Sequence, residues 1–189
     1  EVLVAADGIH SPIRNKLLPN SKERYAGYTC WRAIIDNTKL QITESSETWG
    51  SNGRFGIVPL AHNKIYWFAC INAKAQDEKM KALRVADLAE HFKNFHTPIP
   101  QILQETKDEH LLWNDINDLQ PIHQFAFGNI VLIGDAGHAT TPNMGQGACQ
   151  AVEDAYVLGK LFGQGKSVEE IFAQYEKLRI KKLTLLLIQ

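Results

Sequence analysis

The stretch from Gly128 to Ala155 constrains the fold more than any other part of the chain. It begins with an unbroken apolar run, Ile130 to Ile133, whose β-branched residues predict a short strand buried on both faces, as in a parallel sheet. Gly134-Asp135 ends this strand, a loop with Pro142 follows, and Gly145-Gln146-Gly147 opens a helix. A carboxylate at the carboxyl end of a buried strand, beside a glycine-flanked helix start, predicts a site for a ligand that carries phosphate or hydroxyl groups. The helix is expected to bury Ala148, Ala151, Val152, Ala155 and Leu158.

A second strand–turn–helix unit lies at the N-terminus. Val2 to Ala6 predicts another buried strand, and Asp7-Gly8 predicts the turn that ends it. Ser11 to Leu18 predicts a helix, because Ser is a favoured N-cap and the Pro that follows is a favoured first helical residue. Arg14 lies one turn into this helix. The turn therefore places a second carboxylate between the end of a strand and the start of a helix.

The central part of the chain changes from helical spacing to the two-residue period of strands. Aromatic and β-branched runs alternate there with turns rich in Asn, Gly and Ser, which predicts strands joined as an antiparallel sheet. Pro59, near the end of one run, favours a strand end or a sheet edge. The predicted strands cover Tyr25–Asp36, Glu47–Gly50, Arg54–Leu60 and Lys64–Asn72.

The remaining segments predict helices that flank a further strand. Amphipathic spacing predicts a helix over Val85–Phe95, and a shorter helix over Gln101–Thr106 follows a proline-rich break. His110–Ile116 predicts a strand. Ser167 and Glu170 form a capping-box pattern, which starts a last helix. The buried face of that helix is expected to include Ile171, Phe172, Tyr175 and Leu178.

These elements predict an α/β (α+β) fold in which a sheet lobe is inserted into a nucleotide-binding type of lobe. The first lobe comprises residues 1–24 and 110–189, and the inserted antiparallel-sheet lobe comprises residues 25–109. A single buried strand is not stable without a paired neighbour, so the strands near the two ends of the chain are expected to pair. Because a parallel strand needs neighbours and Glu1 leads at once into one, we expect the chain to be a piece of a longer protein.

Composition argues against several classes of function. The 189 residues carry a formal net charge of -1, so there is no electrostatic basis for binding nucleic acid or an anionic membrane. No apolar run approaches the roughly 20 residues of a transmembrane helix. Three cysteines without a C-x-x-C pair predict reduced thiols in a cytoplasmic protein. His91 and His96 lack the spacing of metal ligands, so no metal site is expected.

Two motifs resemble those of the flavin-dependent aromatic hydroxylases, the group A flavoprotein monooxygenases with a p-hydroxybenzoate hydroxylase-like fold. Val2 to Arg14 resembles the Asp-Gly motif of that family, and residues 128–155 resemble its Gly-Asp motif with the Gly-x-Gly helix start. The order of the motifs and the sheet insert between them also match. Gly27–Arg32 and Phe55–Leu60, together with Tyr66–Phe68, further resemble the branch that contains salicylate hydroxylases, urate hydroxylases and zeaxanthin epoxidases.

The resemblance implies a role for each motif in an FAD site. Asp135 would bond a ribityl hydroxyl, and the amide groups around Gly145–Gly147 would face the flavin, where a helix N-terminus stabilises negative charge. Pro142 would shape the loop between flavin and substrate. The first motif would lie near the pyrophosphate and is also linked to NAD(P)H use. The implied cofactor-binding residues are Asp7, Gly8, Ser11, Arg14, Gly134, Asp135, Pro142, Gly145, Gln146 and Gly147.

The resemblance also implies a substrate wall built from the central sheet, because an aromatic face suits a flat apolar substrate. Trp31, Arg32 and Trp67 are the candidate substrate-binding residues. Trp31 and Arg32 alternate along one strand, so at most one of them faces the substrate. A core position remains the alternative for both tryptophans. His138 is either an acid–base group or a brace for its loop, and Arg14 either a ligand or a plain salt bridge.

The implied activity is that of a monooxygenase which uses NADPH or NADH, FAD and O₂ to hydroxylate or epoxidise an aromatic or conjugated small molecule. FAD would carry the chemistry, so no catalytic side chain is assigned. The chain lacks the G-x-G-x-x-G loop that normally holds the pyrophosphate, so it is expected to bind FAD weakly or not at all and to be inactive alone. Apolar surface left uncovered by the missing unit would favour a homodimer. The alternatives are another flavin enzyme of this fold, such as a halogenase or a tetracycline-inactivating hydroxylase, a non-catalytic binding module of the same fold, and a NAD-binding dehydrogenase.

Overall fold

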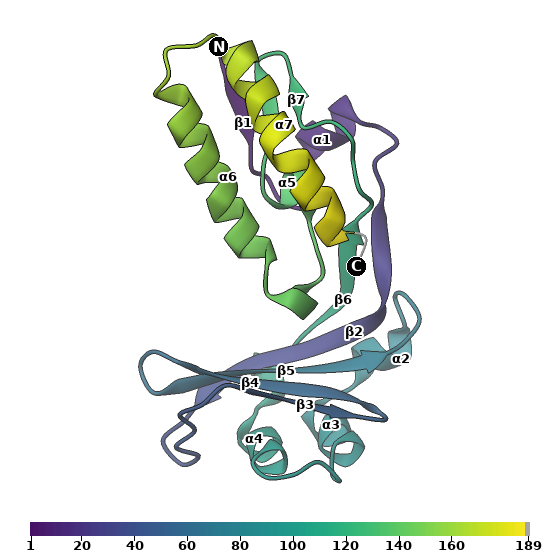
Figure 1. The fold of residues 1–189 in the computed structure, drawn as a ribbon. Coiled ribbons are helices and arrows are strands. Elements are labelled where there is room, and N and C mark those ends of the chain that lie inside the picture. Colours follow the sequence, from purple (N-terminus) through teal and green to yellow (C-terminus); the bar gives the residue numbers. More distant parts are fainter. Residues whose placement is uncertain (188–189) are drawn as a thin grey trace. The chain divides into compact units, whose positions relative to one another are not determined.

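The computed structural model describes residues 1–187, except for the side chain of Leu186, and the chain forms two compact units (Figure 1). Unit 1 comprises Glu1–Ala26 and the chain from Asn117 onward, and unit 2 comprises Gly27–Ile116. Helices and strands occur in both units, as the mixed α/β prediction requires.

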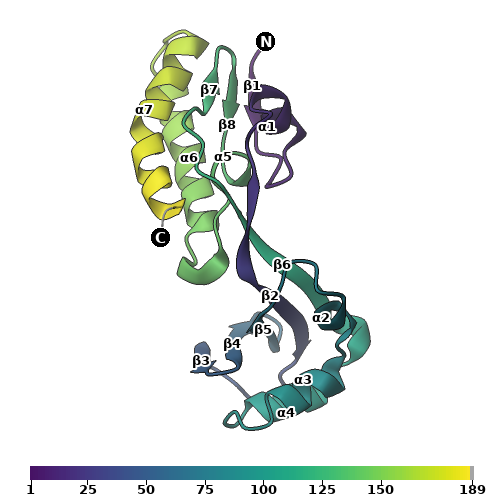
Figure 2. The ribbon, with the colours of Figure 1, turned by 90° about the vertical axis from the view of Figure 1, so that its right-hand side faces the viewer.

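Unit 1 is built on a small sheet with the order β1-β8-β7. β1 (Leu3–Ala5) is parallel to β8 (Ile130–Leu132), and β7 (Ala126–Phe127) is antiparallel to β8. The two ends of the chain therefore meet as expected, because residues 127 positions apart in sequence are register partners. Figures 1 and 2 show the two long helices of this unit side by side. The helices are α1 (Pro12–Leu17), α5 (Asp135–His138), α6 (Gly147–Phe162) and α7 (Val168–Leu187).

Unit 2 is built on a five-stranded sheet with the order β3-β4-β5-β2-β6. Strands β3, β4, β5 and β2 pair antiparallel, as the two-residue period predicts. Pro59 lies beyond the end of the β3 ladder, so it removes no hydrogen bond between those strands. The strands are β2 (Glu23–Asp36), β3 (Ser46–Gly50), β4 (Gly53–Leu60), β5 (Lys64–Asn72) and β6 (Leu112–Leu119).

One face of this sheet carries the core of unit 2. Trp31, Phe55 and Trp67 are fully buried there, and the rings of Phe55 and Trp67 stack with centroids 5.1 Å apart. Leu88 and Phe92 pack against them from the helical side, which Figure 2 shows below the sheet. The helices are α2 (Glu78–Ala82), α3 (Val85–His91) and α4 (Ile99–Glu105), with a 3₁₀ turn at Asp108–His110.

The burial of β1 corrects the prediction of a strand covered on both faces. Leu3 and Val4 are 41% and 40% exposed, whereas Ala5 is buried. β1 is an edge strand among the described residues and pairs only with β8, so it has a neighbour on one side alone. In the central strand β8, Val131 and Leu132 are buried as predicted.

The buried faces of α6 and α7 also differ from prediction. On α6 only Leu158 of the five expected residues is buried, and Val152 is 69% exposed. The buried positions of α6 are Gln150, Asp154, Leu158 and Leu161. On α7, Leu178 is 56% exposed, and the neighbouring Arg179 occupies the interior instead. In both helices a polar side chain occupies the core stripe because it finds a polar partner there.

Candidate cofactor site

The two predicted motif turns follow paired parallel strands. β1 and β8 run in the same direction, with Leu3 opposite Ile130 and Ala5 opposite Leu132. The backbone N–H of Ile133 donates to the carbonyl of Ala5 at 3.0 Å, so the pairing extends to the ends of both strands. The turns at Asp7-Gly8 and Gly134-Asp135 therefore lie at the same edge of the sheet, which is where ligands bind in sheets of this kind.

In the first motif, Ser11 and Arg14 make contacts within the protein. Ser11 caps α1, because its hydroxyl oxygen accepts from the N–H of Arg14 at 2.9 Å. The guanidinium of Arg14 is 1% exposed and donates to the carbonyls of Ile9 (2.5 Å) and Ala136 (3.2 Å). Burial lowers the pKa of Arg14, and the charges of Glu23 and Asp7 oppose that shift.

These contacts show how Ser11 and Arg14 are held in place, and their position near the pyrophosphate of FAD stays a prediction. Both side chains are buried and hydrogen-bonded, which indicates a structural role: Arg14 ties the first motif to the backbone of α5 in the second. Asp7 is exposed and Gly8 half-buried, so these two remain accessible to a ligand. Gly8 has φ +83°, a conformation that favours glycine.

The second motif presents Asp135 from a rigid turn. Gly134 has φ 56° and ψ −145°, a backbone region open almost only to glycine. α5 begins directly after it, and the residues that follow, Ala136 to His138, are buried. Asp135 itself is exposed. The turn therefore holds a carboxylate toward solvent while its neighbours are packed inside.

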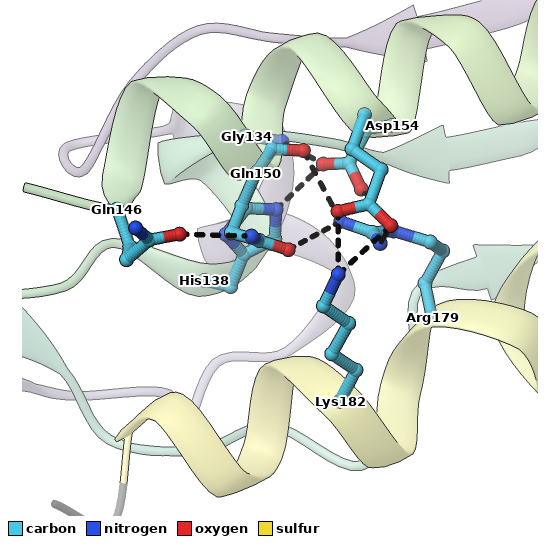
Figure 3. A network of polar contacts seen from close by, with 8 residues as sticks. Gly134, His138, Gln146, Gln150, Asp154, Arg179 and Lys182 are labelled. Carbon is cyan, nitrogen blue, oxygen red and sulfur yellow. Dashed lines mark hydrogen bonds and ion pairs between the residues drawn. The ribbon is translucent and has the colours of Figure 1, made fainter.

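A buried carboxylate on α6 holds this turn from behind (Figure 3). Asp154 Oδ2 accepts from the backbone N–H of Gly134 at 2.9 Å and lies 2.6 Å from His138 Nε2. One oxygen atom thus contacts both ends of the short helix α5. Burial raises the pKa of Asp154, but the hydrogen bonds from His138, Gly134 and Arg179 outweigh it, so the pKa lies below its ordinary value.

Arg179 on α7 supplies the counter-charge to Asp154. Its Nε donates to Asp154 Oδ1 at 2.8 Å, and its Nη2 donates to Gln150 Oε1 at 2.9 Å. Arg179 Nη1 lies 2.8 Å from Glu153 Oε1, which also pairs with Lys182. Figure 3 shows these side chains meeting between α6 and α7. The network therefore links the C-terminal helix to the turn that carries the exposed carboxylate.

Sequence reasoning missed most of this network. The sequence pattern assigns no role to Asp154 or Arg179, and for His138 it leaves open a brace for its loop or an acid–base group. The hydrogen bond of His138 to a buried carboxylate supports the brace. A signal was present: Arg179 lies four residues after Tyr175 on the buried stripe of α7. A polar residue at such a position requires a buried partner.

The start of α6 forms the other part of the candidate site. A 3₁₀ turn at Pro142–Met144 leads to Gly145, which has φ 62° and donates its N–H to the carbonyl of Pro142 at 3.0 Å. Gln146 is the N-cap, and its side chain accepts from Gln150 Nε2 at 3.4 Å but makes no capping bond to the backbone of the first turn. A Cβ on Gly145 would meet no atom within 4 Å, so the approach to this helix start is open.

This arrangement fits the flavin half of an FAD molecule. The first amide groups of a 16-residue helix face an opening bordered by glycine, and they favour a ligand that carries oxygen atoms or negative charge. The exposed carboxylate of Asp135 is suited to accept a hydrogen bond from a ribityl hydroxyl. Within the described residues, no group of three His, Cys, Asp or Glu side chains is arranged to hold a metal ion.

The three predicted substrate residues separate onto two faces of the unit 2 sheet. Trp31 and Trp67 are buried in the core, and Trp67 Nε1 donates to Thr106 Oγ1 at 3.0 Å. This burial supports the alternative of a core position for both tryptophans. Arg32 points the other way and donates to Asn114 Oδ1 at 2.7 Å. Core packing therefore accounts for the tryptophans, and only Arg32 remains accessible.

The face of the sheet that points away from the core is called the second face here. Its side chains alternate along β2, β4 and β5 with those of the core. Arg54 lies there with its guanidinium 4.9 Å from the centre of the Tyr28 ring, and the rings of Tyr66 and Phe68 are 6.1 Å apart. Burial lowers the pKa of Arg54, but the nearby Cys70, Tyr28 and Glu47 outweigh burial, so its pKa lies above the ordinary value. The second face carries Tyr28, Cys30, Arg32, Arg54, Tyr66, Phe68 and Cys70.

Comparison with known proteins agrees with this geometry. The sequence model of the family described as "FAD binding domain" matches residues 1–185. The chain is 39% identical to an aurachin C monooxygenase/isomerase of Stigmatella aurantiaca over 96% of this chain and 48% of that protein. It is 31% identical to an FAD-dependent urate hydroxylase of Klebsiella oxytoca over 97% of this chain and 48% of that protein.

The fold is also similar to solved structures. The crystal structure of Klebsiella pneumoniae HpxO complexed with FAD and uric acid matches with a TM-score of 0.88 and 29% identity, over 100% of this chain and 49% of that chain. The chain therefore belongs to the FAD binding domain family, and the resemblance to flavoprotein hydroxylases is confirmed. The chain spans about half the length of the curated relatives it matches. No helix in the described residues is long and apolar enough to span a bilayer.

Proposed function

We propose that the whole protein is an FAD-dependent monooxygenase that hydroxylates or epoxidises an aromatic or conjugated small molecule with NADPH or NADH and O₂. The observation that carries this proposal is the pairing of β1 with β8, which brings Asp7-Gly8 and Gly134-Asp135 to one sheet edge in a member of an FAD-binding family. The relatives named above, a monooxygenase/isomerase and a urate hydroxylase, support the class of reaction.

In this proposal the residues of unit 1 bind and orient the cofactor. Asp135 accepts a hydrogen bond from the ribityl chain, and the amide groups at the start of α6 stabilise negative charge on the flavin ring. Gly145 and Gly147 allow the backbone to approach the ring without a Cβ. Pro142 shapes the loop before them. FAD, when bound, supplies the redox chemistry through which one atom of O₂ reaches the substrate.

The second face of unit 2 is the proposed contact surface for substrate. It combines aromatic rings with the guanidinium groups of Arg32 and Arg54, both half-buried. Flat rings contact flat substrates, and a guanidinium donates to carboxylate or ring oxygens in its plane. An aromatic or conjugated molecule that carries acceptor oxygens suits this surface. The core tryptophans, Trp31 and Trp67, lie on the opposite face of the sheet and support it.

Retention of FAD by this chain tests the cofactor assignment. We expect the chain alone to bind FAD weakly, since it contains no G-x-G-x-x-G loop for the pyrophosphate. Titration of FAD with fluorescence detection should show saturable binding that the substitution Asp135→Asn weakens about tenfold, the loss expected for one charge-assisted hydrogen bond. Ser51→Ala, on the loop between β3 and β4, is a control that leaves affinity unchanged. Purification with stoichiometric flavin would contradict the weak binding proposed.

The activity requires a separate measurement on the whole protein. Consumption of NADPH and NADH should be followed with aromatic acids, purines and conjugated lipids as candidate substrates. Substrate-dependent consumption that needs FAD is the expected result. A whole protein that binds no flavin and oxidises neither nucleotide would instead favour a non-catalytic binding module of the same fold.

Two finer expectations belong to this proposal. A homodimer is supported by apolar side chains on the surface of α6, where Val152 is 69% and Tyr156 60% exposed. A cytoplasmic location is supported by three free cysteines. Light scattering after size-exclusion chromatography measures the first, and a monomer at all accessible concentrations would refute it.

A further inference from the structure

Two cysteines face each other across the centre of the unit 2 sheet. Cys30 on β2 and Cys70 on β5 are direct register partners. Such partners lie about 4.5–5.5 Å apart between Cα atoms and point to the same face of an antiparallel sheet. A disulfide requires a Cα separation of about 4.4–6.8 Å. The strand pairing alone therefore brings both thiols within bonding range, and both are free.

The thiols lie on the second face and not in the apolar core. Their chain neighbours Trp31 and Ala69 are part of the core, so the alternation of strands directs Cys30 and Cys70 to the opposite side. The two cysteines are 6% and 5% exposed, shielded in part by polar and aromatic side chains. Arg54 is the register partner of Cys70 on its other side, across β4 and β5.

The surroundings distinguish the two sulfur atoms. The neighbouring thiol of Cys30 lowers the pKa of Cys70, burial opposes the shift, and the charge of Arg54 adds to it, while Glu47 acts against it. The neighbouring Cys70 and burial raise the pKa of Cys30, and Arg32 and Arg54 oppose this. Cys30 Sγ also donates to the carbonyl of Trp31 at 3.4 Å. The charge of Arg54 therefore favours the thiolate form at Cys70, whereas Cys30 favours the protonated form. A thiolate beside an arginine is the nucleophilic form of cysteine.

We propose that Cys30 and Cys70 form a redox-responsive pair that closes to a disulfide between β2 and β5 when the protein meets hydrogen peroxide. The Cys70 thiolate attacks one peroxide oxygen, the O–O bond breaks, and the leaving hydroxide takes up a proton to form water. Cys30 then attacks the sulfur of the resulting sulfenic acid, the S–S bond forms and a second water leaves. Two thiols lose two electrons and two protons, and one peroxide is reduced to two waters.

This inference goes beyond the proposed monooxygenase activity and does not require FAD. Closure would join two neighbouring strands of the second face and replace two thiols beside Arg54 with a neutral disulfide. Cys70 would then no longer be able to ionise next to that guanidinium. The oxidation state of the pair would therefore change the chemistry of the surface proposed to contact substrate.

The experiment uses the whole 189-residue chain with Cys149→Ser, which removes the exposed third thiol. The protein is treated with hydrogen peroxide, free thiols are blocked with N-ethylmaleimide, and intact mass and peptide maps are recorded before and after reduction. We expect a mass lower by two hydrogens, no alkylation, a peptide linking Cys30 to Cys70, and full reversal by a reductant. Two alkylated thiols in folded, peroxide-treated protein would overturn the proposal.

Two variants test the assigned roles. With Cys30→Ser, Cys70 should stop at the sulfenic acid and be trapped by dimedone, because the second sulfur is missing. Arg54→Gln should slow disulfide formation at neutral pH about tenfold, and higher pH should restore the rate as the thiolate forms without the guanidinium. Dimedone labelling of Cys30 in a Cys70→Ser variant at the same rate, or no slowing in Arg54→Gln, would refute the assignment of Cys70 as the attacking sulfur.

Discussion

The interior of unit 2 is filled by tryptophan, phenylalanine and aliphatic side chains, whereas the interior of unit 1 includes Asp154, Arg179, His138 and Arg14. In unit 2 one face of the sheet packs on apolar side chains, among them the stacked rings of Phe55 and Trp67. In unit 1 the helices α6 and α7 pack on the sheet and also hold the turn at Gly134, which has an unusual backbone conformation.

The difference shows how the candidate site is held. Apolar packing has no direction, so it cannot by itself set the orientation of the Gly134 N–H or of α5. A buried carboxylate can set that orientation, because its oxygen atoms accept hydrogen bonds from fixed directions. Asp154 contacts both ends of α5 in this way. A buried ion pair contributes little net stability compared with an apolar pair, but it is costly to leave half complete. Four predictions test this contrast between the two interiors.

The largest effect is expected in the apolar interior. Trp67→Ala removes a fully buried ring that stacks on Phe55 and bonds Thr106, and should lower the free energy of unfolding by about 3–5 kcal/mol. Urea titration monitored by circular dichroism measures this. Trp49→Ala is the matched control, since Trp49 is 75% exposed and should cost less than about 1 kcal/mol. Equal losses for both variants would contradict the assignment of Trp67 to the core.

The buried charges of unit 1 should respond differently to single and double substitution. Arg179→Met leaves Asp154 buried without its cation and should cost about 3 kcal/mol. Adding Asp154→Leu should recover part of this loss, because no unpaired charge remains. Recovery should stay incomplete, since Gly134 and His138 lose their acceptor. Urea titration of both variants decides this, and a double variant less stable than Arg179→Met would rule out the half-complete ion pair as the cause.

Acid should destabilise unit 1 through Asp154. The pKa of Asp154 in the folded state is lower than the ordinary value of 3.8. Its contribution to folding stability is therefore complete above pH 3.8, and it is lost as the pH falls through the folded-state pKa. The stability of Asp154→Asn, measured by urea titration from roughly pH 6 to pH 2, should therefore fall less steeply than that of the unchanged chain. Parallel curves for the two proteins would contradict the lowered pKa.

The smallest effect concerns the first motif. Ser11→Ala removes the hydroxyl that accepts from the Arg14 N–H and should cost about 1 kcal/mol. Thermal unfolding followed by circular dichroism is sufficient. No change in Ser11→Ala would indicate that α1 does not depend on its cap.

Much of the fold could be predicted because it depends on local pattern. The two-residue alternation of the central runs predicted β2, β4 and β5, and Ser11-Pro12 predicted the start of α1. The candidate site was predicted as two turns, and their meeting followed from the need of each strand for a neighbour. The faces of α6 and α7 were wrong, because apolar periodicity does not reveal that Asp154 and Arg179 neutralise each other inside.

For a related reason, the sequence could not decide between a core position and a substrate-facing position for Trp31 and Trp67. Trp31 and Arg32 alternate, so the sequence established that they lie on opposite faces of β2, but not which face the helices cover. The position of α3 and α4 decided that Trp31 and Trp67 are core and that Arg32, Arg54 and the two cysteines lie opposite.

The amino-acid sequence by itself determined the strand–turn–helix units, the glycines of the turns, the carboxylate at Asp135 and the family of FAD-binding domains to which they belong. These depend on backbone conformation and on spacing along the chain, which are local. Only the tertiary structure decided which groups are neighbours: Asp154 with Gly134, His138 and Arg179, and Cys30 with Cys70. Those pairs join residues from different elements, and partnership across elements is set by packing.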